Sequence, residues 1–195
     1  MTNGNNNVVI TEHYGDYVPP FQVKGLISEL LCGVSNRYLR GLQAVVLNSS
    51  SGLNRKSRRQ KTLARKRKVA IADCRGVYNQ KWHDGQATIQ LFVDNIIESR
   101  PRWIIKIPFF RRMVFAEVLF HELGHHIHHT TAPEHKERED VAEEWRKRLT
   151  KEYTSNRYGY LKPLKPLLKI VAIVLRTTAK IIGYFTEKKL KNREK

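Results

Sequence analysis

Two histidines and a glutamate near the middle of the chain have the types and spacing of a metal-binding catalytic motif. The segment His121-Glu122-Leu123-Gly124-His125 matches the pattern H-E-x-x-H. Because an α-helix turns about 100° per residue, His121 and His125 are predicted to lie one turn apart on the same face. Two imidazoles at this spacing can hold one tetrahedral zinc ion, with Glu122 beside it as a general base. The motif therefore predicts a zinc (Zn²⁺) site that can activate water.

The residues before the motif predict that it lies on a helix. Residues 111–120 contain no proline or glycine, and Val114, Val118, His121 and His125 recur at helical spacing. The alternative interpretation is a chance match on a histidine-rich surface helix. We disfavour it because the motif interrupts an apolar helix, where unpaired polar side chains are costly to bury.

A zinc site needs a third protein ligand, which the sequence offers downstream. The longer pattern H-E-x-x-H-x-x-G-x-x-H fails here, because its glycine and third-histidine positions hold His128 and Thr131. Residues 137–149 are predicted to form a second helix, on which Glu139 and Glu143 are four residues apart and share a face. This arrangement allows Glu139 to ligate zinc and Glu143 to accept a hydrogen bond from a ligand histidine.

The sequence H-E-L-G-H followed by E-x-x-A at 139–142 resembles the gluzincins, and within them the minimal gluzincins and the ImmA/IrrE-type metallopeptidases. The resemblance covers residues 87–150. It implies a zincin-like domain in which Glu122 is the catalytic base. The zinc ligands that the resemblance implies are His121, His125 and Glu139.

Two features of the same region leave the third ligand open. His135 lies ten residues beyond the motif, directly before the charged helix, and SprT-type proteases use a third histidine. Asp140, Glu143 and Glu144 belong to the same acidic run as Glu139. A solvated helix face, with i, i+4 ion pairs to the arginines and lysines that follow, is the other interpretation of that run. His135 is therefore the alternative metal ligand.

The hydrophobic pattern predicts an α+β fold with a small mixed sheet, an active-site helix, a following glutamate helix and a C-terminal basic amphipathic helix. We expect a flexible N-terminus over 1–19, a metallopeptidase domain over 20–155 and the C-terminal helical segment over 156–195. An amphipathic helix is predicted after Pro20, and strands are expected at 43–47, 69–72, 76–80 and 87–93.

Two segments of this domain are predicted to face a substrate. The resemblance implies an edge strand that holds an extended peptide by main-chain hydrogen bonds, and residues 87–93 are the candidate. Residues 97–110 contain two prolines and several aromatics, so we expect a substrate-side loop or a short insertion. The candidate donors to the oxyanion are the tyrosines that follow the glutamate helix, namely Tyr153, Tyr158 and Tyr160.

Positive charge dominates the composition, with 36 Lys and Arg against 18 Asp and Glu in 195 residues. Nine of these cations lie within 55–68, in a predicted basic loop that spans 48–68. Such a cluster can bind phosphates, and it predicts non-specific nucleic-acid binding because it lacks aromatic side chains for base stacking. The alternatives are a solvated loop, a localisation tract or contact with an acidic protein.

The C-terminal part combines apolar runs with a stripe of cations. Over 165–185, the side chains that fall on one helical stripe are Lys165, Lys169, Arg176 and Lys180. A bilayer span is disfavoured, because three internal cations cost roughly 7–10 kcal/mol against gains of about 0.3–0.6 kcal/mol per large apolar residue. A basic amphipathic helix at a membrane interface or on a partner fits better. A core helix or a lid over the active site are the alternatives.

The remaining features limit the cellular setting and leave three functional hypotheses. Cys32 and Cys74 provide no disulfide framework, and the first residues lack the pattern of a secretion signal. We expect a cytoplasmic protein, with peripheral membrane association as the alternative. The leading hypothesis is a zinc metalloendopeptidase that hydrolyses an intracellular protein or peptide. The others are a SprT- or Spartan-like DNA-associated protease and a non-enzymatic nucleic-acid- or membrane-binding protein with a structural metal site.

Overall fold

The computed structural model describes residues 8–53, 55–64, 67–80, 86–132 and 138–159. The chain divides into two compact units, 1–153 and 154–195, and the fold described below is that of the first unit. Helices and a small mixed sheet confirm the predicted α+β class. No helix among the described residues is both long enough and apolar enough to cross a membrane. The predicted C-terminal helix at 165–185 lies outside the described residues.

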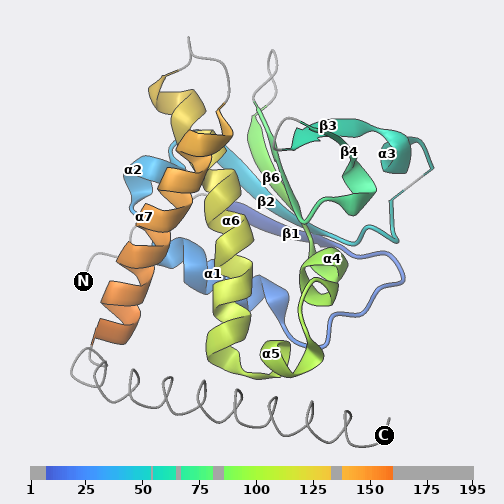
Figure 1. The fold of residues 1–195 in the computed structure, drawn as a ribbon, viewed down its shortest axis with the longest axis horizontal. Coiled ribbons are helices and arrows are strands. Elements are labelled where there is room, and N and C mark those ends of the chain that lie inside the picture. The colour runs from blue at the N-terminus through green and yellow to red at the C-terminus, as the bar shows by residue number, and fades with distance from the viewer. Residues whose placement is uncertain (1–7, 54, 65–66, 81–85, 133–137, 160–195) are drawn as a thin grey trace, which may run out of the picture. The chain divides into compact units, whose positions relative to one another are not determined.

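Four strands form the main sheet, in the spatial order β1-β2-β6-β5. Figure 1 labels three of them, β1, β2 and β6. Their bounds are Val9–His13 for β1, Leu42–Asn48 for β2, Gly76–Asn79 for β5 and Ala87–Phe92 for β6. β1, β2 and β6 run parallel, and β5 runs antiparallel to β6. Alternate residues of the central strands are buried, among them Val45, Leu47, Ile89 and Leu91, so this face of the sheet belongs to the core.

Two predictions about the sheet are wrong. Residues 1–19 were expected to be flexible, but Val9–His13 forms β1 and pairs along its whole length with β2. Residues 87–93 were expected to form an edge strand, but β6 lies between β2 and β5. Strand pairing joins segments far apart in the chain, and alternation of apolar side chains does not reveal how many neighbours a strand has. The edge on this side is β5.

Seven α-helices and one 3-10 helix (Ile71–Asp73) occur in the described residues, and two of the α-helices are long. The bounds are Val23–Cys32 for α1, Asn36–Leu39 for α2, Arg55–Arg59 for α3, Val93–Glu98 for α4, Arg102–Lys106 for α5, Pro108–Thr131 for α6 and Glu139–Tyr158 for α7. The predicted helix after Pro20 is confirmed as α1, which buries the apolar stripe that contains Ile27 and Leu30. α6 starts with proline, whose missing N–H costs nothing at a first helical position. Both α1 and α6 contact the sheet and each other.

Two segments expected to be loops are partly regular. The predicted basic loop 48–68 contains α3, β3 (Lys61–Ala64) and the start of β4 (Arg67–Ala70). β3 and β4 pair antiparallel and form a separate two-stranded sheet. Within 97–110 lies α5, followed by the start of α6. Charge density and proline content do not exclude regular structure in these segments. Exposed cations are compatible with short helices, and proline is favourable at a helix start.

A buried carboxylate joins the ends of two parallel strands. Asp94, at the start of α4 after β6, accepts hydrogen bonds from the backbone N of Ser50 at 2.9 Å and from its hydroxyl at 2.7 Å. The hydroxyl of Ser49 and the backbone N of Ser51 also donate to Asp94. Burial raises the pKa of Asp94, but the hydrogen bonds from Ser50, Asn95 and Ser51 outweigh it and lower the pKa overall. This network holds the turn after β2 against the turn after β6.

Candidate metal centre

The H-E-x-x-H motif lies within the C-terminal half of α6. His121 and His125 lie one turn apart, with their ring centroids 4.9 Å from each other. Glu122 and His125 are buried, at 7% and 6% exposed, while the side chain of His121 is 21% exposed. The helix positions these residues firmly because the apolar residues beside them, Phe120 and Leu123, are fully buried. The motif is therefore part of the core and not a surface helix.

Close backbone packing brings α7 to this part of α6. A methyl group built on Gly124 would lie 2.6 Å from the carbonyl oxygen of Ala142 and 2.8 Å from its Cα. Gly124 therefore has no room for a side chain, and Ala142 is fully buried. Glu139 precedes Ala142 by three residues, so it lies about one turn away on the same side of α7. The contact between Gly124 and Ala142 therefore sets the distance between Glu139 and the histidines.

Three potential ligands converge at this contact. One ligand atom from each of His121, His125 and Glu139 lies within 4.8 Å of the others, and this is the only such metal-binding group among the described residues. The Nε2 atom of His121 lies 3.4 Å from Oε2 of Glu139. Zinc bonds of 2.0–2.2 Å place two ligands of a tetrahedral site about 3.4 Å apart. The residues present therefore fit a tetrahedral zinc ion, with one position left for water or substrate.

Glu143 lies on the other side of the His121 ring from Glu139. Its Oε2 atom is 3.9 Å from Nδ1 of His121, which is longer than a hydrogen bond. Arg146 holds the carboxylate instead, with contacts of 2.7 and 2.5 Å. That hydrogen-bonded pair with Arg146 is the main reason why the pKa of Glu143 is lowered. The predicted hydrogen bond from His121 to Glu143 is therefore not made at this distance, and Glu143 pairs with Arg146 instead.

The other acids of the run face away from the centre. Asp140 pairs with Arg138 at 2.5 Å, and both side chains are more than half exposed. Glu144 is exposed as well. The two predictions for this run are thus compatible, because some of its acids face solvent while Glu139 and Glu143 turn toward α6.

The edge strand β5 contacts a different face of α6. A methyl group built on Gly76 would lie 2.8 Å from Oε1 of Glu122 and 2.8 Å from Cγ1 of Val118. The absence of a side chain at Gly76 therefore makes room for the Glu122 carboxylate. Burial, and then the negative charge of Glu122, raise the pKa of the nearby Cys74 thiol. Glu122 thus lies between the histidine face of α6 and the backbone of β5.

One turn beyond Glu122, a second contact ties α6 to β5. His126 is fully buried, with Nε2 3.1 Å from the carbonyl oxygen of Arg40 and Nδ1 3.3 Å from the hydroxyl of Tyr78. A carbonyl only accepts, so Nε2 carries the proton and Nδ1 accepts from Tyr78 when the ring is neutral. Burial is the main cause of the lowered pKa of His126. His126 therefore bridges β5, α6 and the turn before β2.

Several other predicted candidates can be placed. His128 is buried but does not belong to the metal-binding group. The alternative ligand His135 lies outside the described residues. Tyr153, a suggested oxyanion donor, donates instead to Glu29 at 2.9 Å, and it lies about 21 Å along α7 from Glu139. Tyr158 is further along α7, and Tyr160 lies outside the described residues.

Sequence reasoning missed the roles of Gly76 and His126, and it included Ala142 in the second motif without predicting its packing against Gly124. The sequence does contain a signal for Gly76, because an isolated glycine inside a β-rich run indicates close backbone approach. The small residue at Ala142, one turn after Glu139, is the matching signal for close helix packing. No signal identified His126, because its partners come from residues 40 and 78.

No protein-family model, curated protein sequence or solved structure matches this chain. Its function therefore has to be argued from the chemistry and geometry of the site.

Proposed function

We propose that this chain is a zinc-dependent metallopeptidase, with His121, His125 and Glu139 as the zinc ligands and Glu122 as the general base. The observation that carries the proposal is the convergence of three donor atoms within 4.8 Å on α6 and α7. A purely structural metal site has no need for a buried carboxylate at Glu122. Glu122 is only 7% exposed, and its carboxylate fits beside β5 because Gly76 has no side chain.

The chemistry divides between the ion and the chain. Zinc, when bound, supplies Lewis-acid polarisation of a carbonyl and makes water nucleophilic at neutral pH. Glu122 takes the proton of the attacking water and delivers it to the leaving amine. His121, His125 and Glu139 leave one coordination position open for this chemistry. Burial of Glu122 beside β5 limits the movement of its carboxylate, so the base is held near its working position.

The strand β5 is the proposed binding edge for the peptide substrate. Among the described strands it pairs only with β6, so its other edge has no strand partner. An extended peptide can add to such an edge through main-chain hydrogen bonds. Gly76 on this strand is next to Glu122. A peptide held along β5 would therefore lie beside the general base, which favours an unfolded or loop segment as the substrate.

The first test is the zinc content of the purified full-length chain, measured by elemental analysis. We expect one zinc per chain in the wild type and in Glu122→Gln, and no stoichiometric zinc in Glu139→Ala. Glu144→Ala is the matched control, because this exposed glutamate lies on the same helix but outside the centre. Absence of zinc from a folded wild type would overturn the proposal.

A second comparison separates the peptidase hypotheses from each other and from a structural site. Loss of zinc in His135→Ala, with zinc kept in Glu139→Ala, would replace Glu139 by His135 and support the SprT-like alternative. Hydrolysis of unfolded fluorescent casein should fall at least about 100-fold in Glu122→Gln, because a general base contributes that much or more. Zinc-dependent cleavage that Glu122→Gln leaves unchanged would rule out the proposed base.

A further inference from the structure

Large apolar side chains are exposed together where α5 meets the start of α6. Four of the six exposed large apolar residues of the described chain lie within eight positions. They are Trp103 at 61%, Ile107 at 40%, Phe109 at 40% and Phe110 at 42% exposed. Ile105, between them, is only 5% exposed and anchors α5 to the core. The exposure is therefore a property of a folded and anchored surface, and a patch of this kind marks an interaction site.

This surface is also basic. Residues 99–116 contain five cations and no acid. Two of the five have carboxylate partners, since Arg100 pairs with Glu117 at 2.9 Å and Arg112 with Glu29 at 2.9 Å. The other three, Arg102, Lys106 and Arg111, have no ion pair with any described residue. We call these three cations and the four exposed apolar residues the aromatic–basic surface.

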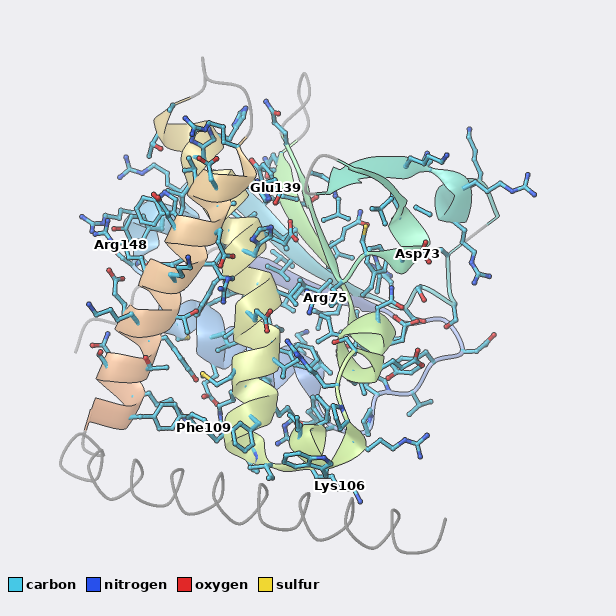
Figure 2. The ribbon with its side chains drawn as sticks, in the orientation of Figure 1. Asp73, Arg75, Lys106, Phe109, Glu139 and Arg148 are labelled. Atoms are coloured by element: carbon cyan, nitrogen blue, oxygen red, sulfur yellow. The ribbon has the colours of Figure 1, made fainter. Side chains whose placement is uncertain are left out.

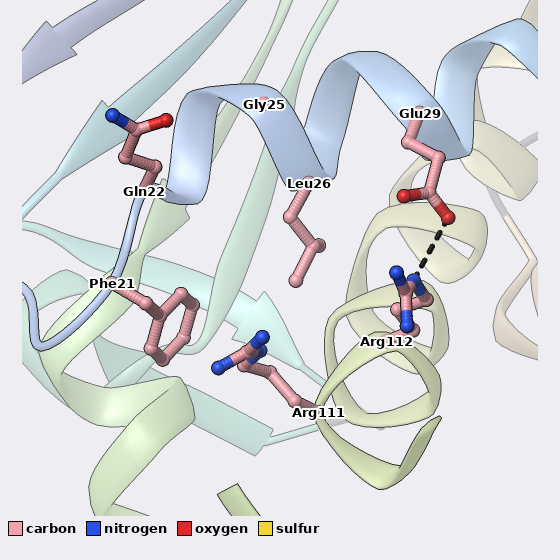
Figure 3. A pocket seen from close by; sticks show the side chains of 7 residues that line it. All are labelled: Phe21, Gln22, Gly25, Leu26, Glu29, Arg111 and Arg112. Carbon is pink, nitrogen blue, oxygen red and sulfur yellow. Dashed lines mark hydrogen bonds and ion pairs between the residues drawn. The ribbon is translucent and has the colours of Figure 1, made fainter. Parts of the chain in front are cut away.

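A small pocket holds one of these cations in place. Residues of α1, of the segment directly before it and of α6 line a cavity of about 270 Å³, shown in Figure 3. The guanidinium of Arg111 lies over the ring of Phe21, 4.4 Å from its centroid. Glu29, which also lines the cavity, forms an ion pair with Arg112. Arg111 follows Phe110 directly in the chain. Arg111, which has no ion pair with any described residue, is therefore held by a cation–π contact with Phe21.

We propose that the aromatic–basic surface docks onto an anionic lipid bilayer. Tryptophan and phenylalanine insert at the boundary between headgroups and acyl chains, and lysine and arginine bind lipid phosphates at the same level. An aliphatic side chain, Ile107, belongs to the surface, and it suits lipid better than the stacking of nucleic-acid bases. The chain carries a net charge of +18, which complements a negative bilayer.

A second part of the chain has the composition that stable membrane binding requires. Residues 165–185 combine apolar runs with the cations Lys165, Lys169, Arg176 and Lys180. One weak membrane signal gives only marginal and reversible binding, whereas two signals together give stable anchoring. The folded surface and this sequence segment therefore supply two signals of the same kind.

The docking surface is separate from the metal centre. Phe109 precedes His121 by twelve residues on one helix, which corresponds to about 18 Å along the axis of α6. Figure 2 shows Phe109 and Lys106 at the end of α6 that lies away from Glu139. The inference does not depend on the proposed peptidase activity, because none of its residues is a metal ligand or the base.

The test is sedimentation of the full-length protein with vesicles of phosphatidylcholine, with and without phosphatidylglycerol. We expect binding that requires phosphatidylglycerol and decreases with salt. The double variant Phe109→Ser/Phe110→Ser should lower the partition coefficient at least about tenfold, and Arg102→Gln/Lys106→Gln should lower it by a similar factor. Val18→Ser is the matched control, since Val18 is 84% exposed but lies outside this surface.

Each other outcome would overturn the inference. Equal binding to neutral and anionic vesicles would remove the role of the cations. Binding that the two double variants leave unchanged would assign membrane contact to 165–185 alone. A surface that binds single-stranded DNA through Phe109 and Phe110, without binding vesicles, would be a nucleic-acid site. Zinc content should be unchanged in all variants, so failure here is distinguishable from failure of the peptidase proposal.

Discussion

The two sides of α6 that build the candidate centre each depend on a missing side chain, but in different ways. On the side facing α7, the absent side chain of Gly124 leaves room for the backbone of Ala142. On the side facing β5, the absent side chain of Gly76 leaves room for side-chain atoms of Glu122 and Val118. A backbone contact cannot relax unless a whole helix moves. A side-chain contact can relax by a change of rotamer.

Under the proposed function, metal binding and positioning of the base would therefore depend on two separate contacts. The α7 contact sets where Glu139 lies relative to His121, and thus whether three ligands converge. The β5 contact sets where the carboxylate of Glu122 lies once the ligands are in place. Substitutions on the α7 side should therefore lower zinc affinity, and substitutions on the β5 side should lower the rate of hydrolysis.

The largest effect is expected from Gly124→Ala, which forces α7 away from α6. Over-packing of this kind costs about 1–3 kcal/mol of stability. Zinc affinity should also fall, by at least the roughly 100-fold that loss of an outer partner of a ligand can cost. Thermal unfolding and zinc titration measure the two effects.

The matched control for Gly124→Ala is Gly25→Ala. Gly25 also lies in a helix, but a methyl group there would meet no atom within 4 Å. Its replacement should be neutral or stabilising by up to about 1 kcal/mol, since alanine favours a helix. Equal effects of the two substitutions on zinc affinity would show that the contact with Ala142 does not position Glu139.

Gly76→Ala should separate hydrolysis from metal binding. The new methyl group displaces the Glu122 carboxylate, and a misplacement of about 1 Å can lower the rate about 100-fold. The proposed zinc ligands lie on another face of α6 and on α7, so zinc affinity should stay within about twofold of the wild type. Casein hydrolysis and zinc titration on the same preparation test this. Loss of zinc in this variant would mean that the two sides are coupled.

Glu143→Gln should have a smaller effect on zinc affinity, about tenfold or less. The 3.9 Å separation from Nδ1 of His121 is too long for a hydrogen bond, and Arg146 already holds the carboxylate. Glu144→Gln serves as the reference, because Glu144 is exposed on the same helix. A loss as large as that of Glu139→Ala would make Glu143 a ligand and change the assignment of the centre.

The smallest effect is expected from Tyr78→Phe, which removes the hydroxyl that donates to His126. A single hydrogen bond of 3.3 Å to a buried neutral group accounts for about 1 kcal/mol of stability. Chemical denaturation should detect this loss, with zinc affinity unchanged. Destabilisation well above this value would indicate that the whole β5 edge depends on the bridge through His126.

Prediction from sequence succeeded where the information was local. The positions of His121, Glu122 and His125 on one helix followed from spacing alone, and α1 followed from its apolar stripe. Prediction failed at β1 and β6, because pairing partners lie far apart in the chain. It also failed at 48–68, where a loop was predicted but a short helix and paired strands occur, and at 97–110 it did not predict the helix α5.

The sequence by itself determined which groups could do chemistry, because helical periodicity places His121 and His125 on one face whatever surrounds the helix. Helical spacing within 137–149 allowed Glu139 as a ligand with Glu143 behind a histidine, but it left His135 open as the alternative. Only the tertiary structure shows that Glu139 lies with His121 and His125 in one group of possible ligands, because the backbone contact of Gly124 with Ala142 brings α7 against α6. Close packing between distant segments is a property of complementary surfaces, which no local pattern encodes.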